Sequence, residues 1–96
     1  MLRYGTWMKF SCGARVRVSD DYHWARGASG FVTAYPSFIS ETATGELVDE
    51  ATMAVPTLQG IVYQSWVTFD EPQHDADGDG PYEAGMIHNT ALVSIQ

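Results

Sequence analysis

The segment 13–36 constrains the fold of this 96-residue chain more than any other. Residues 14–18, ARVRV, alternate apolar and charged side chains, the period-two pattern of a strand with one buried and one solvent-facing side. A polar loop with aromatic residues and glycines follows. A second β-rich run, 30–35, stops at Pro36, which cannot donate a ladder hydrogen bond. A strand, a long loop and a second strand in this order predict the start of a small antiparallel barrel.

The remaining β-rich segments complete the expected barrel. Residues 61–69 are β-branched and aromatic throughout, which favours a strand. They are followed by an acidic loop at 70–81, a strand near 82–88, a single helical turn around 89–91 and a last short strand at 92–95. We therefore expect residues 1–96 to form one all-β domain, an antiparallel barrel of four to five strands with a 3₁₀ turn before the last strand.

The strand 61–69 has two apolar faces. Tyr63 and Val67 point to one side, and Trp66 points to the other. Because the barrel core covers one face only, the second face must be covered by another segment of the chain or by a partner. We expect both Trp66 and Tyr35 to lie in the core.

Residues 37–60 are longer than the tight turn that a minimal barrel needs between its second and third strands. Thr44 is a candidate N-cap for a short helix over 46–54, although Gly45 and Pro56 disfavour a helix there. A hairpin that extends the sheet and an ordered excursion from the barrel are the alternatives. The pattern leaves all three open.

Charge is distributed unevenly along the chain. The five basic residues all lie in the first 26 positions, where Asp20 and Asp21 oppose them, and 5 − 2 leaves +3. Residues 27–96 hold ten carboxylates and no Lys or Arg, which brings the total to the stated −7. We expect some of these carboxylates to meet the arginines across the barrel. Such a surface repels nucleic acid and anionic lipid and attracts a basic partner or a cation. A surface kept acidic for solubility explains the same charge.

Cysteine usage and hydropathy indicate the compartment. Cys12 is the single cysteine, so no internal disulfide can form, which fits a reducing cytoplasm. We expect Cys12 to be a buried or half-buried hydrophobe rather than a reactive thiol. No stretch approaches the roughly eighteen apolar residues of a membrane span, and the N-terminus lacks the apolar core of a secretory signal. We therefore expect a cytoplasmic protein with no membrane partner.

The order of these elements resembles SH3-like small barrels and, among them, the photosystem I subunit IV (PsaE) family, whose relatives include small ferredoxin-docking subunits. The resemblance is carried by residues 16–18, 21–24, 30–32, 66–69 and 92–95. It implies a barrel with a scaffold or docking role. The insertion at 37–60 and the acidic charge depart from that family, so no site is carried over. The segment from Phe69 to Tyr82 also resembles small bacterial proteins, which implies no activity.

Aromatic residues mark a candidate partner-binding surface. SH3-like barrels use rings on the first loop and neighbouring strands to line a shallow groove, where they supply contact area at low entropic cost. The candidate residues here are Tyr22, His23, Trp24, Arg26 and Tyr82. For Tyr22 and Trp24 a partly exposed position and a core position remain equally open.

The acidic loop contains a candidate metal site. Asp75, Asp77 and Asp79 alternate and precede Gly80, as the first ligands of a calcium loop do. The twelfth position, which should supply a bidentate Glu, is Met86, and Glu83 is the later carboxylate in reach. These residues predict at most a weak Ca²⁺ or Mg²⁺ site. A turn rich in Asp and Gly explains the same sequence without any metal.

Signs of catalysis are absent from the sequence. His23, His74 and His88 lack the spacing of zinc ligands, and Cys12 lacks a recognisable base. Residues 27–30 contain glycines but neither the lysine nor the following helix of a phosphate-binding loop. We expect no enzymatic activity and no tightly bound cofactor. Five cations in a chain of net charge −7 also make nucleic-acid binding less favourable than protein binding.

The sequence therefore predicts an SH3-like, non-catalytic protein-interaction or accessory module whose partner is a protein, and the acidic charge leaves a basic partner open. One alternative is a Ca²⁺- or Mg²⁺-binding domain that uses the acidic loop. The other is an acidic inhibitor of a basic protein, of the immunity type that neutralises a toxin. The oligomeric state is left open.

Overall fold

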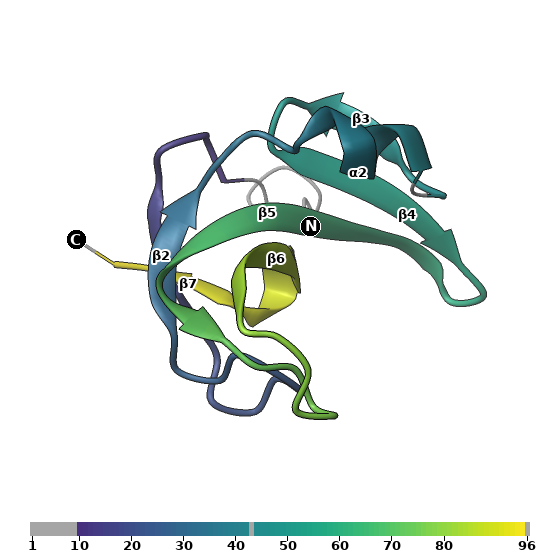
Figure 1. Cartoon of the computed structure of the whole chain (residues 1–96). Helices are drawn as coiled ribbons and strands as arrows, with labels where there is room; N and C mark the ends of the chain where they lie inside the picture. Colours follow the sequence, from purple (N-terminus) through teal and green to yellow (C-terminus); the bar gives the residue numbers. More distant parts are fainter. Residues whose placement is uncertain (1–9, 43, 96) are drawn as a thin grey trace.

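A computed structural model describes residues 10–42 and 44–95 of the chain. Its centre is an antiparallel sheet that curls into a barrel-like shape (Figure 1). Along the sheet the strand order is β3-β4-β5-β2-β1-β7, and β6 pairs with β5 off this path. The elements are β1 (Arg15–Val18), β2 (Ser29–Val32), α2 (Ser37–Thr42), β3 (Glu46–Asp49), β4 (Thr52–Thr57), β5 (Gly60–Gln73), β6 (Tyr82–His88), the 3₁₀ helix η1 (Asn89–Ala91) and β7 (Leu92–Ser94).

The barrel core lies on the concave side of the sheet. Val16 and Val18 of β1 are fully buried, while Arg15 and Arg17, which alternate with them, point outward, as the alternation predicted. Strands from both ends of the chain close around these valines, because β1 pairs with β2 on one side and with β7 on the other. The remaining buried apolar side chains of the cluster are Ala25, Val32, Ala51, Val67, Phe69, Ile87, Ala91 and Leu92.

Gly30 permits the close approach of β2 to β5. It pairs with Phe69, and a Cβ at this position would lie only 2.3 Å from the backbone oxygen of Thr68. Because no side chain fits in that space, a glycine is needed for the sheet to bend sharply here.

The structure confirms the expected all-β, barrel-like fold and the order of its elements. The strand at 82–88 and the helical turn at 89–91 have the predicted bounds. The second strand ends at Val32 rather than at residue 35. The strand expected at 61–69 extends to Gln73, because Gln73 pairs with Tyr82 of β6.

Within the inserted segment, residues 37–60, the structure shows the hairpin. The helix suggested over 46–54 is wrong, because those residues form most of β3 and β4, which add two antiparallel strands to the proximal half of β5. The helix of this region is instead the short α2, which begins directly after Pro36 and precedes β3 in the chain (Figure 1). Met53 of β4 is fully buried. The insertion therefore extends the sheet through β3 and β4 rather than forming an excursion outside it.

Two further observations concern Cys12 and membrane-spanning helices, the features from which the compartment was inferred. Cys12 is exposed, so its predicted place as a buried or half-buried hydrophobe is wrong. It precedes the first strand of the barrel and lies in a turn, where its side chain faces solvent. Among the residues described, α2 and η1 fall well short of the length and apolar character that a membrane-crossing helix requires.

Candidate functional site

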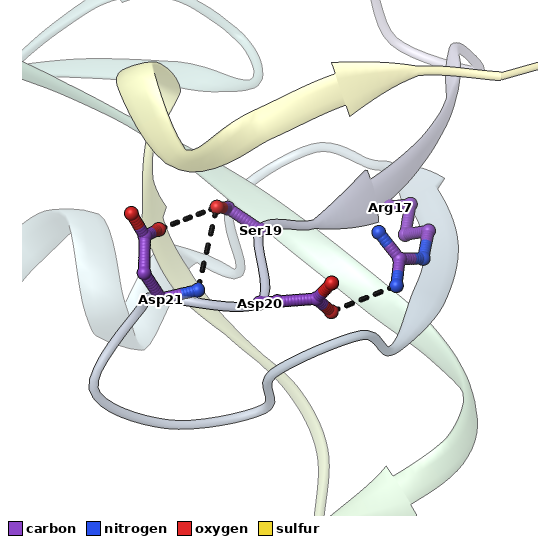
Figure 2. Close-up of polar contacts among 4 residues, drawn as sticks. All are labelled: Arg17, Ser19, Asp20 and Asp21. Atoms are coloured by element: carbon purple, nitrogen blue, oxygen red, sulfur yellow. Dashed lines mark hydrogen bonds and ion pairs between the residues drawn. The ribbon is translucent and has the colours of Figure 1, made fainter.

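The loop between β1 and β2 is held in shape by its own short-range contacts (Figure 2). Ser19 donates a hydrogen bond through Oγ to Oδ1 of Asp21 at 2.5 Å, and the Asp21 N–H in turn donates to Ser19 Oγ. Arg17 pairs with Asp20 at 2.8 Å. Asp20 and Asp21 are thus used within the loop, which turns the following aromatic residues toward β6.

Tyr22 connects this loop to the end of β6. Its hydroxyl accepts a hydrogen bond from the backbone N–H of His88 at 3.1 Å, and its ring lies 4.3 Å from that of His23 and 5.6 Å from that of His88. Burial raises the pKa of the Tyr22 hydroxyl, and the bond from His88 opposes that rise. Tyr22 is therefore half-buried and supports His23.

Trp24 lies across the barrel end with its ring against Gly85 of β6. A Cβ at Gly85 would lie 2.5 Å from Trp24 Cη2, so the absence of a side chain there makes room for the indole. The ring also meets Phe69 and Tyr82 edge-on, at centroid distances of 5.5 and 6.2 Å. After Trp24 the chain turns through Ala25, at φ +55°, which buries the Ala25 side chain in the core.

Trp66 lies on the other face of the sheet. It stands opposite Met86 of β6, and its ring packs at 5.4 Å against Tyr35. The Tyr35 hydroxyl donates to the backbone oxygen of Gln64 at 2.8 Å, and burial raises the pKa of this hydroxyl strongly. Tyr35 is thus a core residue, as predicted. Trp66 is only half-buried, because its opposite side faces a groove.

These side chains line an open groove of about 470 Å³. The loop after β1 contributes His23 and Trp24, β5 contributes Trp66, and the β5–β6 loop contributes two carboxylates. The lining is completed by β6, and the full set is His23, Trp24, Trp66, Asp75, Ala76, Asp77, Tyr82, Ala84, Gly85 and Met86. The groove combines aromatic walls with an acidic rim, a combination suited to an extended chain that carries positive charge.

The structure places the predicted partner-binding residues in two separate regions of the surface. His23, Trp24 and Tyr82 meet in the groove, and Tyr22 supports it from behind. Arg26 lies elsewhere, beside a hollow of about 360 Å³ that Asp70 and Glu71 also line. The sequence predicts Trp66 as a core residue and gives Met86 no role in a site. The feature that indicated this groove is that both faces of β5 are apolar, since the barrel core covers only one of them.

The acidic loop brings together three of the four predicted metal ligands. Ligand oxygens of Asp75, Asp77 and Asp79 lie within 4.8 Å of one another, and Glu83 is not in this group. Asp75 Oδ1 accepts hydrogen bonds from the backbone N–H groups of Asp77 and Asp79, at 3.0 and 2.9 Å. These bonds account for the loop conformation without a cation, so metal binding stays a prediction.

Two groups at the groove have shifted pKa values. Partial burial raises the pKa of the Tyr82 hydroxyl, and the charges of Asp75 and Asp79 raise it further. Burial lowers the pKa of His88, and the nearby His23 lowers it further. The Tyr82 hydroxyl therefore stays protonated at neutral pH, where its hydrogen bond to Asp75 also favours the protonated form.

The arginines of β1 are engaged by carboxylates, as expected. Arg15 makes two hydrogen bonds to Asp70, at 2.8 and 2.6 Å, and its guanidinium lies over the ring of Phe31 at 4.7 Å. The hydrogen bonds from Arg15 lower the pKa of Asp70. With Arg17 paired to Asp20, the β1 cations are already neutralised locally, which weakens the case for a nucleic-acid surface.

Comparisons with known proteins add no function to this description. No family model, curated protein or solved structure matches the chain. The resemblance to the photosystem I subunit IV family therefore stays a prediction, and any function must be argued from the groove itself.

Proposed function

We propose that this chain is a non-catalytic protein-interaction module of the cytoplasm, and that its groove binds a basic segment of a partner protein. The proposal rests on one observation. Three aromatic side chains, Trp24, Trp66 and Tyr82, line the same open groove as two carboxylates. Aromatic rings attract cations through their faces, and Tyr and Trp are enriched where binding energy is concentrated.

The charge of the chain supports a basic partner. The carboxylates of Asp75 and Asp77 line the groove, and residues 27–96 contain no Lys or Arg to neutralise them. A lysine or arginine of the partner meets both attractive features at once, the aromatic walls and the acidic rim. An acidic partner meets repulsion on the same surface.

Selection from a phage-displayed library of random dodecapeptides tests this proposal. We expect the enriched peptides to carry several Lys or Arg residues and to compete for one surface. Asp77→Asn should weaken their binding several-fold. Glu71→Gln removes the same charge beside the separate hollow and serves as the matched control, because both side chains are exposed. No enrichment, or equal losses in the two variants, contradicts the proposal.

The identity of a native partner separates two forms of this function. Capture of a basic toxin favours the inhibitor of the immunity type, and a partner from a stable housekeeping complex favours the accessory role. Both forms require the same groove, so Met86→Lys, which places a cation within it, should weaken either interaction. Val93→Lys, at an exposed position of β7, is the control.

A divalent cation is the alternative ligand, supported by the mutual distance of the three aspartates. Titration with CaCl₂ or MgCl₂, followed by amide chemical shifts, tests it. Saturable shifts confined to residues 75–80 favour a site, and their absence up to millimolar concentration rejects one.

A further inference from the structure

Within the described residues, the outer edge of β6 has no partner strand. Trp66 N–H donates to Ala51 O at 3.1 Å, and Trp66 O accepts from Thr33 N–H at 2.9 Å, so both groups point away from β6. In an antiparallel ladder the residue opposite such a position also points its N–H and C=O away from the shared edge. Met86, opposite Trp66, therefore directs both groups to the outer edge of β6.

The same alternation places Ala84 and His88 at that edge. His88 confirms the direction, because its N–H donates to the Tyr22 hydroxyl of the first loop. In the described ranges β6 pairs with β5 alone, and the N–H and C=O groups of Ala84 and Met86 make no hydrogen bond to another segment there. Unpaired backbone groups on a strand edge are a template for another strand.

The groove runs along this edge. Three consecutive residues, Ala84, Gly85 and Met86, line it, although successive side chains of a strand point to opposite faces. Because Gly85 has no side chain, the hollow meets its backbone between Ala84 and Met86. Trp24 borders it on one face and Trp66 on the other. The groove therefore has the form of a slot for an extended chain.

Both ends of the slot are defined. At one end Tyr22 already occupies the His88 N–H, so pairing stops after Met86. At the other end Tyr82 lies beside Asp75 and Asp77, the two carboxylates that line the groove. Between these ends a short strand finds four backbone hydrogen-bonding groups, those of Ala84 and Met86, and negative charge at its margin.

We propose that the basic segment binds as an added β-strand along the outer edge of β6, with backbone hydrogen bonds to Ala84 and Met86 and a lysine or arginine beside Asp75 and Asp77. This inference rests on the proposed function and specifies its binding mode. Affinity then comes from main-chain pairing, and preference for a basic sequence comes from the side chains that line the slot.

The test uses one defined probe, the acetylated and amidated peptide Lys-Val-Arg-Val-Lys, at up to millimolar concentration. Two derivatives carry N-methyl groups, one on both valines and one on the three basic residues. Because alternate N–H groups of a strand point to opposite sides, only one derivative blocks the edge that pairs with β6. We expect one derivative to lose about tenfold or more in affinity and the other to lose much less. The amides of Ala84 and Met86 should gain protection from hydrogen exchange.

The other outcomes separate the two proposals. If the peptide binds the groove but both derivatives bind as well as the parent, strand addition is overturned while the proposed function stands. If the peptide does not bind, or the acidic peptide Glu-Val-Glu-Val-Glu binds equally, the inference fails, and the library selection judges the function separately. If the Ala84 and Met86 amides are protected before any peptide is added, the edge is already covered. Sedimentation equilibrium then distinguishes coverage by a second copy of the protein from coverage by another segment of the same chain.

Discussion

At the scale of single residues, the groove depends on a contact between an indole and a glycine. Trp24 lies where a side chain at position 85 would otherwise be, and this contact sets one wall of the groove. The same ring packs edge-on against Phe69, which is part of the barrel core. A residue of the candidate site is therefore also a residue of the fold, so changes at Trp24 affect stability as well as binding.

Gly85→Ala should lower the free energy of unfolding by about 1–3 kcal/mol, because the added methyl group overlaps Trp24 Cη2. In a Trp24→Ala background the same change should cost much less. Denaturant unfolding of the four proteins measures this coupling. Additive effects contradict the placement of Trp24 on Gly85.

Buried polar contacts matter at the same scale. Ser65 Oγ donates to Asn89 Oδ1 at 2.6 Å, and both residues are buried where β5 meets η1. Ser65→Ala should destabilise the protein by about 1–3 kcal/mol, because the Asn89 oxygen loses a donor that water cannot readily replace. Thermal unfolding tests this, with the exposed Ser94→Ala as the control. Equal midpoints for the two variants argue against the contact.

His88 makes stability depend on pH. Its folded-state pKa lies below the ordinary value of 6.5, so the unfolded chain binds the proton more readily. Stability should therefore be complete above about pH 6.5 and decline as the pH falls toward the folded-state pKa. His88→Gln should flatten the profile between about pH 7.5 and pH 5.5. Parallel profiles for the two proteins in urea unfolding contradict this assignment.

At the scale of elements, β5 organises the molecule. Its proximal half pairs with β4, its distal half pairs with β2, and its opposite edge pairs with β6. This arrangement joins the insertion to the barrel through one long strand. It also leaves the outer edge of β6 without a partner strand in the described part of the chain, and that edge borders the candidate site.

The insertion should contribute to the stability of the whole fold. Met53 is fully buried, and the backbone of Gly45 passes so near that a Cβ there would lie 2.7 Å from Met53 Cγ. Met53→Ala should cost about 2–5 kcal/mol. Leu58→Ala, at the fully exposed tip of the β4–β5 turn, should change stability by less than about 0.5 kcal/mol. A single cooperative transition that Met53→Ala leaves unmoved would show that the insertion is only an appendage.

At the scale of the whole molecule, the separation of charge governs association. The basic residues are confined to the first 26 positions, and those of β1 are paired with Asp70 and Asp20, whereas residues 27–96 hold ten carboxylates and no Lys or Arg. Long-range attraction of a basic peptide should follow from this, and salt should reduce it, since the screening length falls from about 10 Å at 0.1 M to about 3 Å at 1 M.

The affinity for an enriched basic peptide should therefore fall steadily with added NaCl. Asp77→Asn should reduce the slope of log Kd against log salt concentration more than Glu71→Gln does, because Asp77 lines the groove. Fluorescence anisotropy at several salt concentrations measures both slopes. An affinity that does not respond to salt rules out the acidic rim as a determinant of binding.

The sequence by itself determined the barrel strands, because alternation of apolar and polar side chains is a local property that any sheet must satisfy. It also determined the one-sided charge and indicated His23, Trp24 and Tyr82 as candidate partner-binding residues. Only the tertiary structure decided that 46–54 is a hairpin, since pairing with β5 outweighs weak local preferences. Only it brought Trp66 and Met86 to the groove and left one edge of β6 without a partner strand among the described residues. Which strand lacks a neighbour depends on the order of strands in the sheet, and residue spacing along one chain does not encode that order.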